Sequence, residues 1–118
     1  MLQYPVPVER VFHALADPTR CQMVERLSRG PMAVTALAEP FPMSLAAVLQ
    51  HVRVLEASGI VRSEKIGRVR TCHLQPATLR AAERWITERR TLWEHRLDRL
   101  GEFLAEQDTT SPLPDSTP

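Results

Sequence analysis

The spacing of the apolar residues changes at Ser58-Gly59, and this change constrains the fold more than any other feature. Before it, Leu45 to about Ala57 has apolar residues at helical spacing. After it, IVRSEKIGRVRTCHL (60–74) alternates on both sides of Gly67-Arg68. This pattern is typical of two strands joined by a two-residue type II′ turn. The middle of the chain is therefore predicted to be a helix followed directly by a β-hairpin.

Three further helices are predicted before this segment. Residues 8–16 repeat apolar side chains at i, i+3, i+4 and i+7, and Asp17-Pro18 breaks the pattern. Aspartate suits an N-cap and proline suits the first helical position, so a second helix is expected from there to about Arg29. A short helix should span Val34 to Ala38, followed by a turn with two prolines. Ser44 is the expected cap of the helix that begins at Leu45.

The last predicted helix begins at Pro76 and continues to about Glu106. It is roughly 30 residues long, or about 45 Å, which exceeds the width of a domain of this size. Part of its apolar stripe should therefore be buried in a partner, although a helix folded back across its own core is the alternative. We expect an N-terminal arm (1–7), one domain (8–106) and a polar, proline-rich, disordered tail (107–118). The stripe consists of Leu79, Ala82, Ile86, Trp93, Leu97, Leu100 and Leu104.

Composition and charge narrow the choice of function. The chain has 118 residues, 43% of them hydrophobic, which suits one compact domain. The net charge is +1, but residues 43–75 hold five basic against two acidic residues. A local basic patch is typical of a phosphate-binding face, and a solvated surface is the alternative. The sequence has no apolar run of about 18 residues and no basic, apolar start, so we expect a cytoplasmic protein without membrane contact.

The order of the predicted elements indicates a helix-turn-helix with the hairpin as its wing. The fold class expected is mostly α (α+β): a winged helix-turn-helix with a two-stranded β-wing and a long C-terminal dimerisation helix. Double-stranded DNA is the expected partner, because the second helix of such a unit enters the major groove. Gln50 can read adenine, and His51 and Arg53 can bond guanine or phosphate. A basic wing tip can contact the backbone or minor groove. The expected DNA contacts are Ser44, Leu45, Ala46, Ala47, Gln50, His51, Arg53, Lys65, Arg68 and Arg70.

Two segments, ALADPTRCQMVERLSRGPMAVTALA (14–38) and MSLAAVLQHVRVLEASGIVRSEKIGRVRTCHL (43–74), resemble the ArsR (arsenic repressor) family of winged-helix regulators. The resemblance covers about Val8 to Leu104. It implies a homodimer formed by the first and last helices (8–16 and 77–106). It also implies repression at a two-fold symmetric operator, often near the gene's own promoter. The interface residues expected from this are Val8, Val11, Phe12, Trp93, Leu97, Leu100 and Leu104.

The chain departs from the family pattern at positions that bear on sensing. Many relatives have serine where this chain has Leu49. Metal-sensing relatives carry a Cys-x-Cys cluster near the recognition unit, and residues 34–44 hold no cysteine. On the last helix, His95 and Asp98 with their acidic neighbours could form half of an interfacial metal site, and this alternative stays open. Since Zn²⁺ prefers cysteine and histidine, we expect no metal site and no cofactor.

Three functions remain open, and an enzyme is not among them. The first is a repressor that does not sense metal, with a possible unknown small-molecule inducer. The second is a metal- or thiol-responsive repressor of the same fold, using His95 or the two cysteines. The cysteines are expected to be free thiols, with Cys21 on the apolar face of its helix and Cys72 in the hairpin. The third is a winged-helix protein-interaction module, which the basic wing argues against. No nucleophile–base pair or phosphate loop indicates catalysis.

Overall fold

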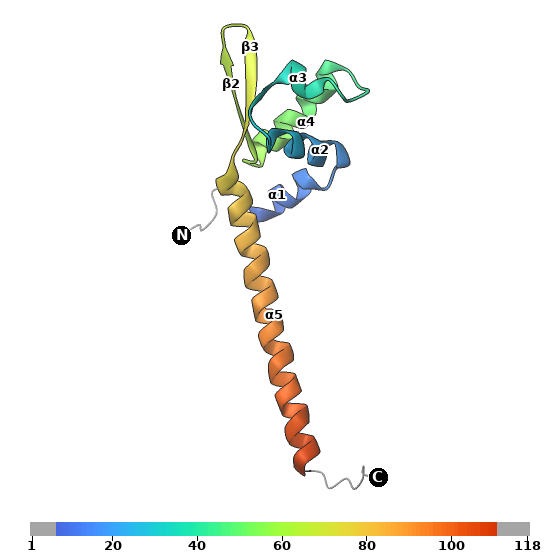
Figure 1. Cartoon of the computed structure of the whole chain (residues 1–118), viewed down its shortest axis with the longest axis vertical. Coiled ribbons are helices and arrows are strands. Elements are labelled where there is room, and N and C mark those ends of the chain that lie inside the picture. Colours follow the sequence, from blue (N-terminus) through green and yellow to red (C-terminus); the bar gives the residue numbers. More distant parts are fainter. Residues whose placement is uncertain (1–6, 111–118) are drawn as a thin grey trace. The chain divides into compact units, whose positions relative to one another are not determined.

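The computed structural model describes residues 7–110, and the side chains of residues 7–107. Residues 1–6 of the predicted arm and 111–118 of the predicted tail lie outside the described residues, whereas residues 107–110, expected in the disordered tail, are helical. The chain divides into two compact units, residues 1–83 and 84–118. The elements, shown in Figure 1, are α1 (Val8–Leu15), α2 (Pro18–Leu27), β1 (Met32–Ala33), α3 (Val34–Ala38), α4 (Leu45–Ala57), β2 (Val61–Ile66), β3 (Val69–Leu74) and α5 (Pro76–Thr110).

The predicted helix caps are confirmed. Asp17 precedes α2 in an extended conformation, and its carboxylate accepts a hydrogen bond from the backbone N–H of Arg20 at 3.1 Å, with Pro18 at the first helical position. Ser44 caps α4 in the same way, because its Oγ accepts from the N–H of Ala47 at 3.1 Å. The two caps fix where α2 and α4 begin, and α2 ends at Leu27 rather than near residue 29.

The predicted hairpin is confirmed as an antiparallel pair in which Ile66 pairs with Val69. Gly67 has φ +64°, and no described residue other than glycine has a positive φ. The turn therefore fits type II′, because type I′ needs positive φ at both of its central residues. The sequence did not predict a third strand, β1. This strand pairs with β3, so the strand order is β1-β3-β2. With only two residues, β1 is too short to show alternation.

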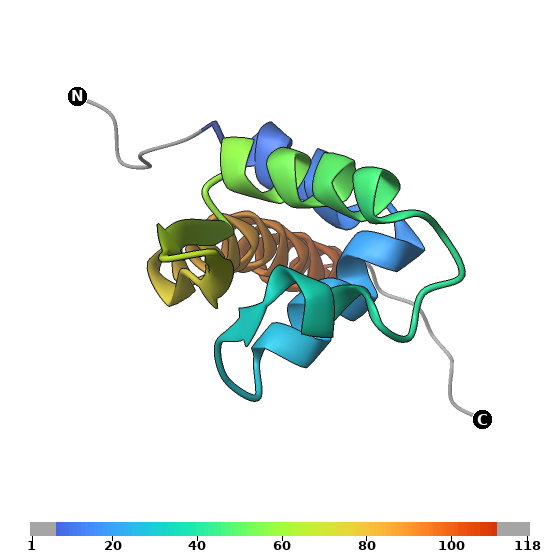
Figure 2. The same cartoon turned by 90° about the horizontal axis from the view of Figure 1, so that it is seen from above.

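The core of the first unit lies where α1, α2 and α4 meet the sheet. The α4 helix lies alongside α1, as Figure 2 shows. It buries Val48, Val52 and Leu55. Each fully buried side chain of this kind contributes about 1.5–3 kcal/mol relative to exposure. The other core residues are Val11, Ala14, Met23, Leu27, Val34, Leu37, Phe41, Ile60, Val61, Cys72 and Ala82.

Two hydrogen bonds join the start of α5 to the turn that follows α4. The backbone N–H of Gln75 donates to the carbonyl of Ile60 at 2.8 Å. The hydroxyl of Thr78 donates to the carbonyl of Gly59 at 2.7 Å. Ala81 and Ala82 are buried on the same helix. The first turns of α5 are therefore part of the core that holds the helix-turn-helix.

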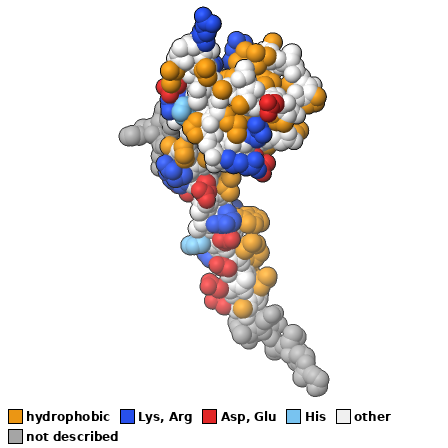
Figure 3. Space-filling model, turned by 45° about the horizontal axis from the view of Figure 1, so that its top comes forward, with side chains coloured by type: hydrophobic (Ala, Val, Ile, Leu, Met, Phe, Trp, Pro, Cys, Tyr) orange, Lys and Arg blue, Asp and Glu red, His pale blue; other side chains and the backbone are white. Residues whose placement is uncertain are grey.

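The second unit is helical over residues 84–110, and its apolar side chains lie exposed along one edge of the helix (Figure 3). Trp93, for example, is 59% exposed. No helix within residues 7–110 combines the length and apolarity that a membrane span requires. The exposed residues are Ile86, Leu92, Trp93, Leu97, Leu100, Phe103 and Leu104.

Candidate nucleic-acid interface

The exposed face of α4 presents a short polar stripe next to the capped end of the helix. Ala46, Gln50 and Arg53 follow i, i+4, i+7 spacing, and all three are exposed. Within the described part of the chain, no hydrogen bond or ion pair engages the side chain of Gln50 or Arg53. Leu45 is 47% exposed on the first turn. A helix N-terminus also favours anions, so this end of α4 suits a groove flanked by phosphates.

His51 does not share this stripe. Its side chain is 22% exposed, and its Nδ1 lies 3.1 Å from Nη1 of Arg20 and 3.9 Å from Oδ2 of Asp17. Nε of Arg20 in turn donates to the carbonyl of Ala14 at 2.7 Å. Sequence reasoning missed Arg20 as part of this surface. The sequence signals were its position in the first turn of α2, three residues after the Asp17 cap, and its place in the segment 14–38 that carries the family resemblance.

Asp17 is held in its charged form by this cluster. The backbone N–H of Arg20 lowers the pKa of the Asp17 carboxyl most, and the charges of Arg20 and His51 lower it further, although partial desolvation opposes them. At neutral pH the ionised carboxylate of Asp17 therefore lies beside Arg20 and His51.

The tip of the wing carries unpaired positive charge. Lys65 lies near the end of β2 and Arg68 lies in the turn, and both are exposed. Among residues 7–107, no ion pair or hydrogen bond engages either side chain. Figure 3 shows basic side chains gathered at the hairpin tip. Arg70 is exposed as well, but its Nη1 donates to the hydroxyl of Ser63 at 3.0 Å. Arg62 lies 3.5 Å from Glu64 in an exposed ion pair. The charge that is free to meet phosphate is therefore concentrated at Lys65 and Arg68.

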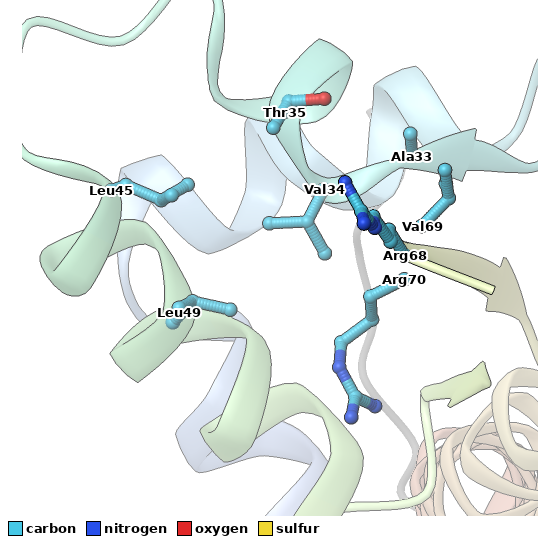
Figure 4. Close-up of a pocket in the computed structure, with 8 residues that line it drawn as sticks. All are labelled: Ala33, Val34, Thr35, Leu45, Leu49, Arg68, Val69 and Arg70. Atoms are coloured by element: carbon cyan, nitrogen blue, oxygen red, sulfur yellow. The ribbon is translucent and has the colours of Figure 1, made fainter. Parts of the chain in front are cut away.

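A hollow of about 340 Å³ lies between α4 and the wing (Figure 4). In Figure 4, Leu45 and Leu49 of α4 and Val34 of α3 face the hollow, and Arg70 reaches in from β3. An apolar floor with guanidinium groups at its side suits the sugars and phosphates of a DNA strand. The lining residues are Ala33, Val34, Thr35, Leu45, Leu49, Arg68, Val69 and Arg70.

The residues expected at a dimer interface differ in exposure. Val11 is 3% exposed and packs within the core of its own chain, so it is not available to a partner. Val8 and Phe12 on α1 are half-buried. The α5 residues Trp93, Leu97, Leu100 and Leu104 are all exposed.

The two cysteines are free thiols in different surroundings. The prediction that Cys21 lies on an apolar face is wrong, because this residue is exposed and its thiol donates to the carbonyl of Leu15 at 2.9 Å. Cys72 is buried. Burial raises the pKa of its thiol, and the nearby Glu56 raises it further, against a smaller opposite effect of Arg70. Among the described residues, no three His, Cys, Asp or Glu side chains gather as metal ligands would.

Comparison with known proteins places this architecture in a family. Residues 15–64 match a family model described as a helix-turn-helix domain. The HTH-type transcriptional regulator Rv2034 of Mycobacterium tuberculosis is 44% identical over 62% of this chain and 68% of that protein. An ArsR-like transcriptional regulator from Rhodococcus sp. RHA1 is 30% identical, with a TM-score of 0.74 over 81% of this chain and 91% of that one.

A second solved structure, the crystal structure of an ArsR family transcriptional regulator, is more similar in sequence. It is 48% identical, with a TM-score of 0.73, and the alignment covers 80% of this chain and 97% of that one. This chain therefore belongs to the ArsR family of winged helix-turn-helix transcriptional regulators, which are DNA-binding proteins and not enzymes.

Proposed function

We propose that the protein is a homodimeric repressor that binds a two-fold symmetric operator in a sequence-specific manner and does not sense metal. The observation that carries this proposal is the unpaired polar stripe of Gln50 and Arg53 on α4, beside the unpaired basic tip of the wing. Base edges and phosphates would supply the partners that these side chains lack within residues 7–107.

In this proposal the first turn of α4 enters the major groove. Ser44, Leu45, Ala46 and Ala47 lie nearest the bases, and the short side chains of the two alanines allow close approach. Gln50 reads an adenine, and Arg53 bonds guanine or a phosphate. Lys65, Arg68 and Arg70 contact the backbone or the minor groove. Three contacts in each of two protomers give a salt dependence with a slope of roughly −5.

The apolar edge of α5 supports the homodimer. Monomeric proteins rarely expose a contiguous apolar surface of this kind, and a helix edge pairs readily with its own copy. Trp93, Leu97, Leu100 and Leu104 form the α5 part of the proposed interface, and Val8 and Phe12 form the α1 part. Two-fold symmetry in the protein then requires two half-sites in the DNA, separated by a whole number of helical turns.

The metal-free part of the proposal rests on donor chemistry, because Zn²⁺ prefers cysteine and histidine ligands. His95, Asp98, Glu94 and Glu102 lie on α5, and among the described residues no trio of ligands comes together. One relative, 35% identical over 57% of this chain, is named a cadmium resistance regulatory protein homolog, from Staphylococcus aureus. That name describes the relative, so metal has to be tested directly on this chain.

Fluorescence anisotropy of the purified protein tests the proposal. The probes are a duplex from upstream of the protein's own gene and a shuffled duplex, at two salt concentrations, with and without Zn²⁺ and with and without a chelator. Tight, salt-sensitive binding that prefers the native duplex and ignores metal is the expected result. Loss of binding on adding Zn²⁺ would replace the proposal with a metal-responsive repressor. Equal binding to both duplexes would contradict operator recognition at that site.

A further inference from the structure

His51 lies next to the DNA-facing Gln50 in the sequence, but the structure gives it a partner inside the protein. We propose that His51 is a positioning residue: its bond to Arg20 holds the recognition helix α4 on the α1–α2 pair. It then contributes to DNA binding through the orientation of α4 rather than through contact with a base. This inference rests on the proposed function, in which α4 meets the DNA.

Arg20 is suited to this role because its position is fixed by other bonds. Its backbone N–H donates to Asp17 at 3.1 Å, and Nε donates to the carbonyl of Ala14 at 2.7 Å. Nη2 reaches the carbonyl of His13 at 3.4 Å. The guanidinium thus satisfies carbonyls at the C-terminal end of α1, where a positive charge is favourable. The remaining atom, Nη1, points to His51 on α4.

The bond to Arg20 also determines the state of the His51 ring. A guanidinium has only donors, so a neutral His51 ring that bonds to it accepts at Nδ1 and carries its proton on Nε2. A side chain with an acceptor at the position of Nδ1 should therefore preserve the bond to Arg20, and asparagine offers such an acceptor in its Oδ1. Glutamine instead reaches the position of Nε2, from which it could still contact DNA but could not accept from Arg20.

The contact matters because few other polar bonds hold this part of α4. The side chains of Gln50 and Arg53 on either side of His51 point to solvent and have no partner within residues 7–107. The core residues Val48 and Val52 fix the depth of the helix, but apolar contacts tolerate small rotations. Base recognition requires placement within about 0.5 Å, and a directional hydrogen bond supplies this precision.

A set of variants of the full chain tests the proposal: His51→Ala, His51→Asn, His51→Gln, Arg20→Ala and the double variant with alanine at both positions. His95→Ala, on the exposed surface of α5, is the control. Thermal unfolding identifies a temperature at which every variant is folded. Anisotropy is then measured on the native and shuffled duplexes at that temperature, so that losses of fold and losses of binding are separated.

His51→Ala and Arg20→Ala should each weaken binding to the native duplex by about tenfold, the effect of losing one charge-assisted hydrogen bond. The double variant should lose no more than Arg20→Ala alone, because removing His51 then breaks no further bond to Arg20. His51→Asn should stay within about twofold of the wild type, and His51→Gln should behave like His51→Ala. Binding retained by His51→Gln and lost by His51→Asn would overturn the proposal in favour of direct DNA contact through Nε2.

Additive losses in the double variant would also overturn the proposal. If Arg20→Ala fails to fold, the asparagine and glutamine variants still decide between the two roles. Failure of the wild type to distinguish the two duplexes would instead count against the proposed function. Urea unfolding of the wild type, the two alanine variants and the double variant measures the coupling between Arg20 and His51 without DNA. It therefore tests the bond itself even if the proposed function fails.

Discussion

Ser63, in the first half of the wing, donates both its backbone N–H and its hydroxyl to Oε2 of Glu56 at the end of α4, at 3.2 and 2.5 Å. Arg70 on the facing strand donates to the same hydroxyl at 3.0 Å. These bonds join the recognition helix to the wing through side chains that are half-buried or exposed. The two parts of the proposed DNA surface are therefore held at a fixed distance from each other.

Replacing Glu56 with alanine should lower the free energy of unfolding by about 1–3 kcal/mol, because the N–H of Ser63 loses its partner in a half-buried position. Glu56→Gln should cost less, since an amide oxygen still accepts. Urea unfolding measures both effects, and Glu25→Ala on the exposed face of α2 is the control. Equal losses in Glu56→Gln and Glu56→Ala would show that the charge, rather than the accepted hydrogen bonds, stabilises the junction.

Gln50→Ala should cost about 1–3 kcal/mol of binding free energy on the native duplex and much less on a shuffled one. The reason is that Gln50 is exposed on the α4 stripe, where it can pair with a base edge, and base contacts discriminate between sequences. Anisotropy titrations on the two duplexes measure the difference. A loss of the same size on both would assign Gln50 to the phosphates instead.

The main elements of the fold were predictable because each leaves a local signal. The spacing of apolar residues, the caps Asp17 and Ser44, and the Gly67-Arg68 turn all depend on residues close in sequence, and the structure confirms them. Strand β1 was missed because two residues cannot show a period. It forms only because β3 offers an open edge next to it.

The site was less predictable, because side-chain partners come from distant segments. Nothing near His51 in the sequence indicates that its ring bonds to Arg20, 31 residues earlier, instead of facing DNA. Cys21 was misplaced for a related reason. Helical periodicity identifies the apolar stripe of a helix. It does not determine which residues at the edge of that stripe are covered by neighbouring helices. Cys21 of α2 is left exposed.

Arg68→Ala should weaken binding to every duplex and make its salt dependence shallower. Arg68 is exposed at the turn of the wing, so it is expected to neutralise a phosphate without reading sequence. The slope of log K against log salt should decrease by about 0.9 for each of the two copies in a dimer. Arg99→Ala on α5 removes the same charge elsewhere. If it changes the slope equally, the effect is one of net charge and not of the wing.

Leu97→Glu should convert the protein to monomers. Leu97 lies at the middle of the exposed apolar edge of α5, and a buried carboxylate facing its symmetry mate is unfavourable. Sedimentation velocity measures the change, and DNA affinity should fall with it. His95→Glu adds the same charge two residues away, outside this edge, and should leave the dimer intact. A stable Leu97→Glu dimer would place the interface elsewhere.

In the native protein one thiol should react quickly with a thiol reagent and the other should not. Cys21 is exposed, whereas Cys72 is buried in β3 and has a raised pKa, so at pH 8 it stays in the unreactive protonated form. Cys21→Ser should abolish the fast reaction, and Cys72→Ser should leave it unchanged. Both thiols should react in urea. Fast reaction of Cys72 in the folded protein would show that the wing opens readily, and it would favour a thiol-responsive repressor in which modification at β3 disturbs the surface that binds DNA.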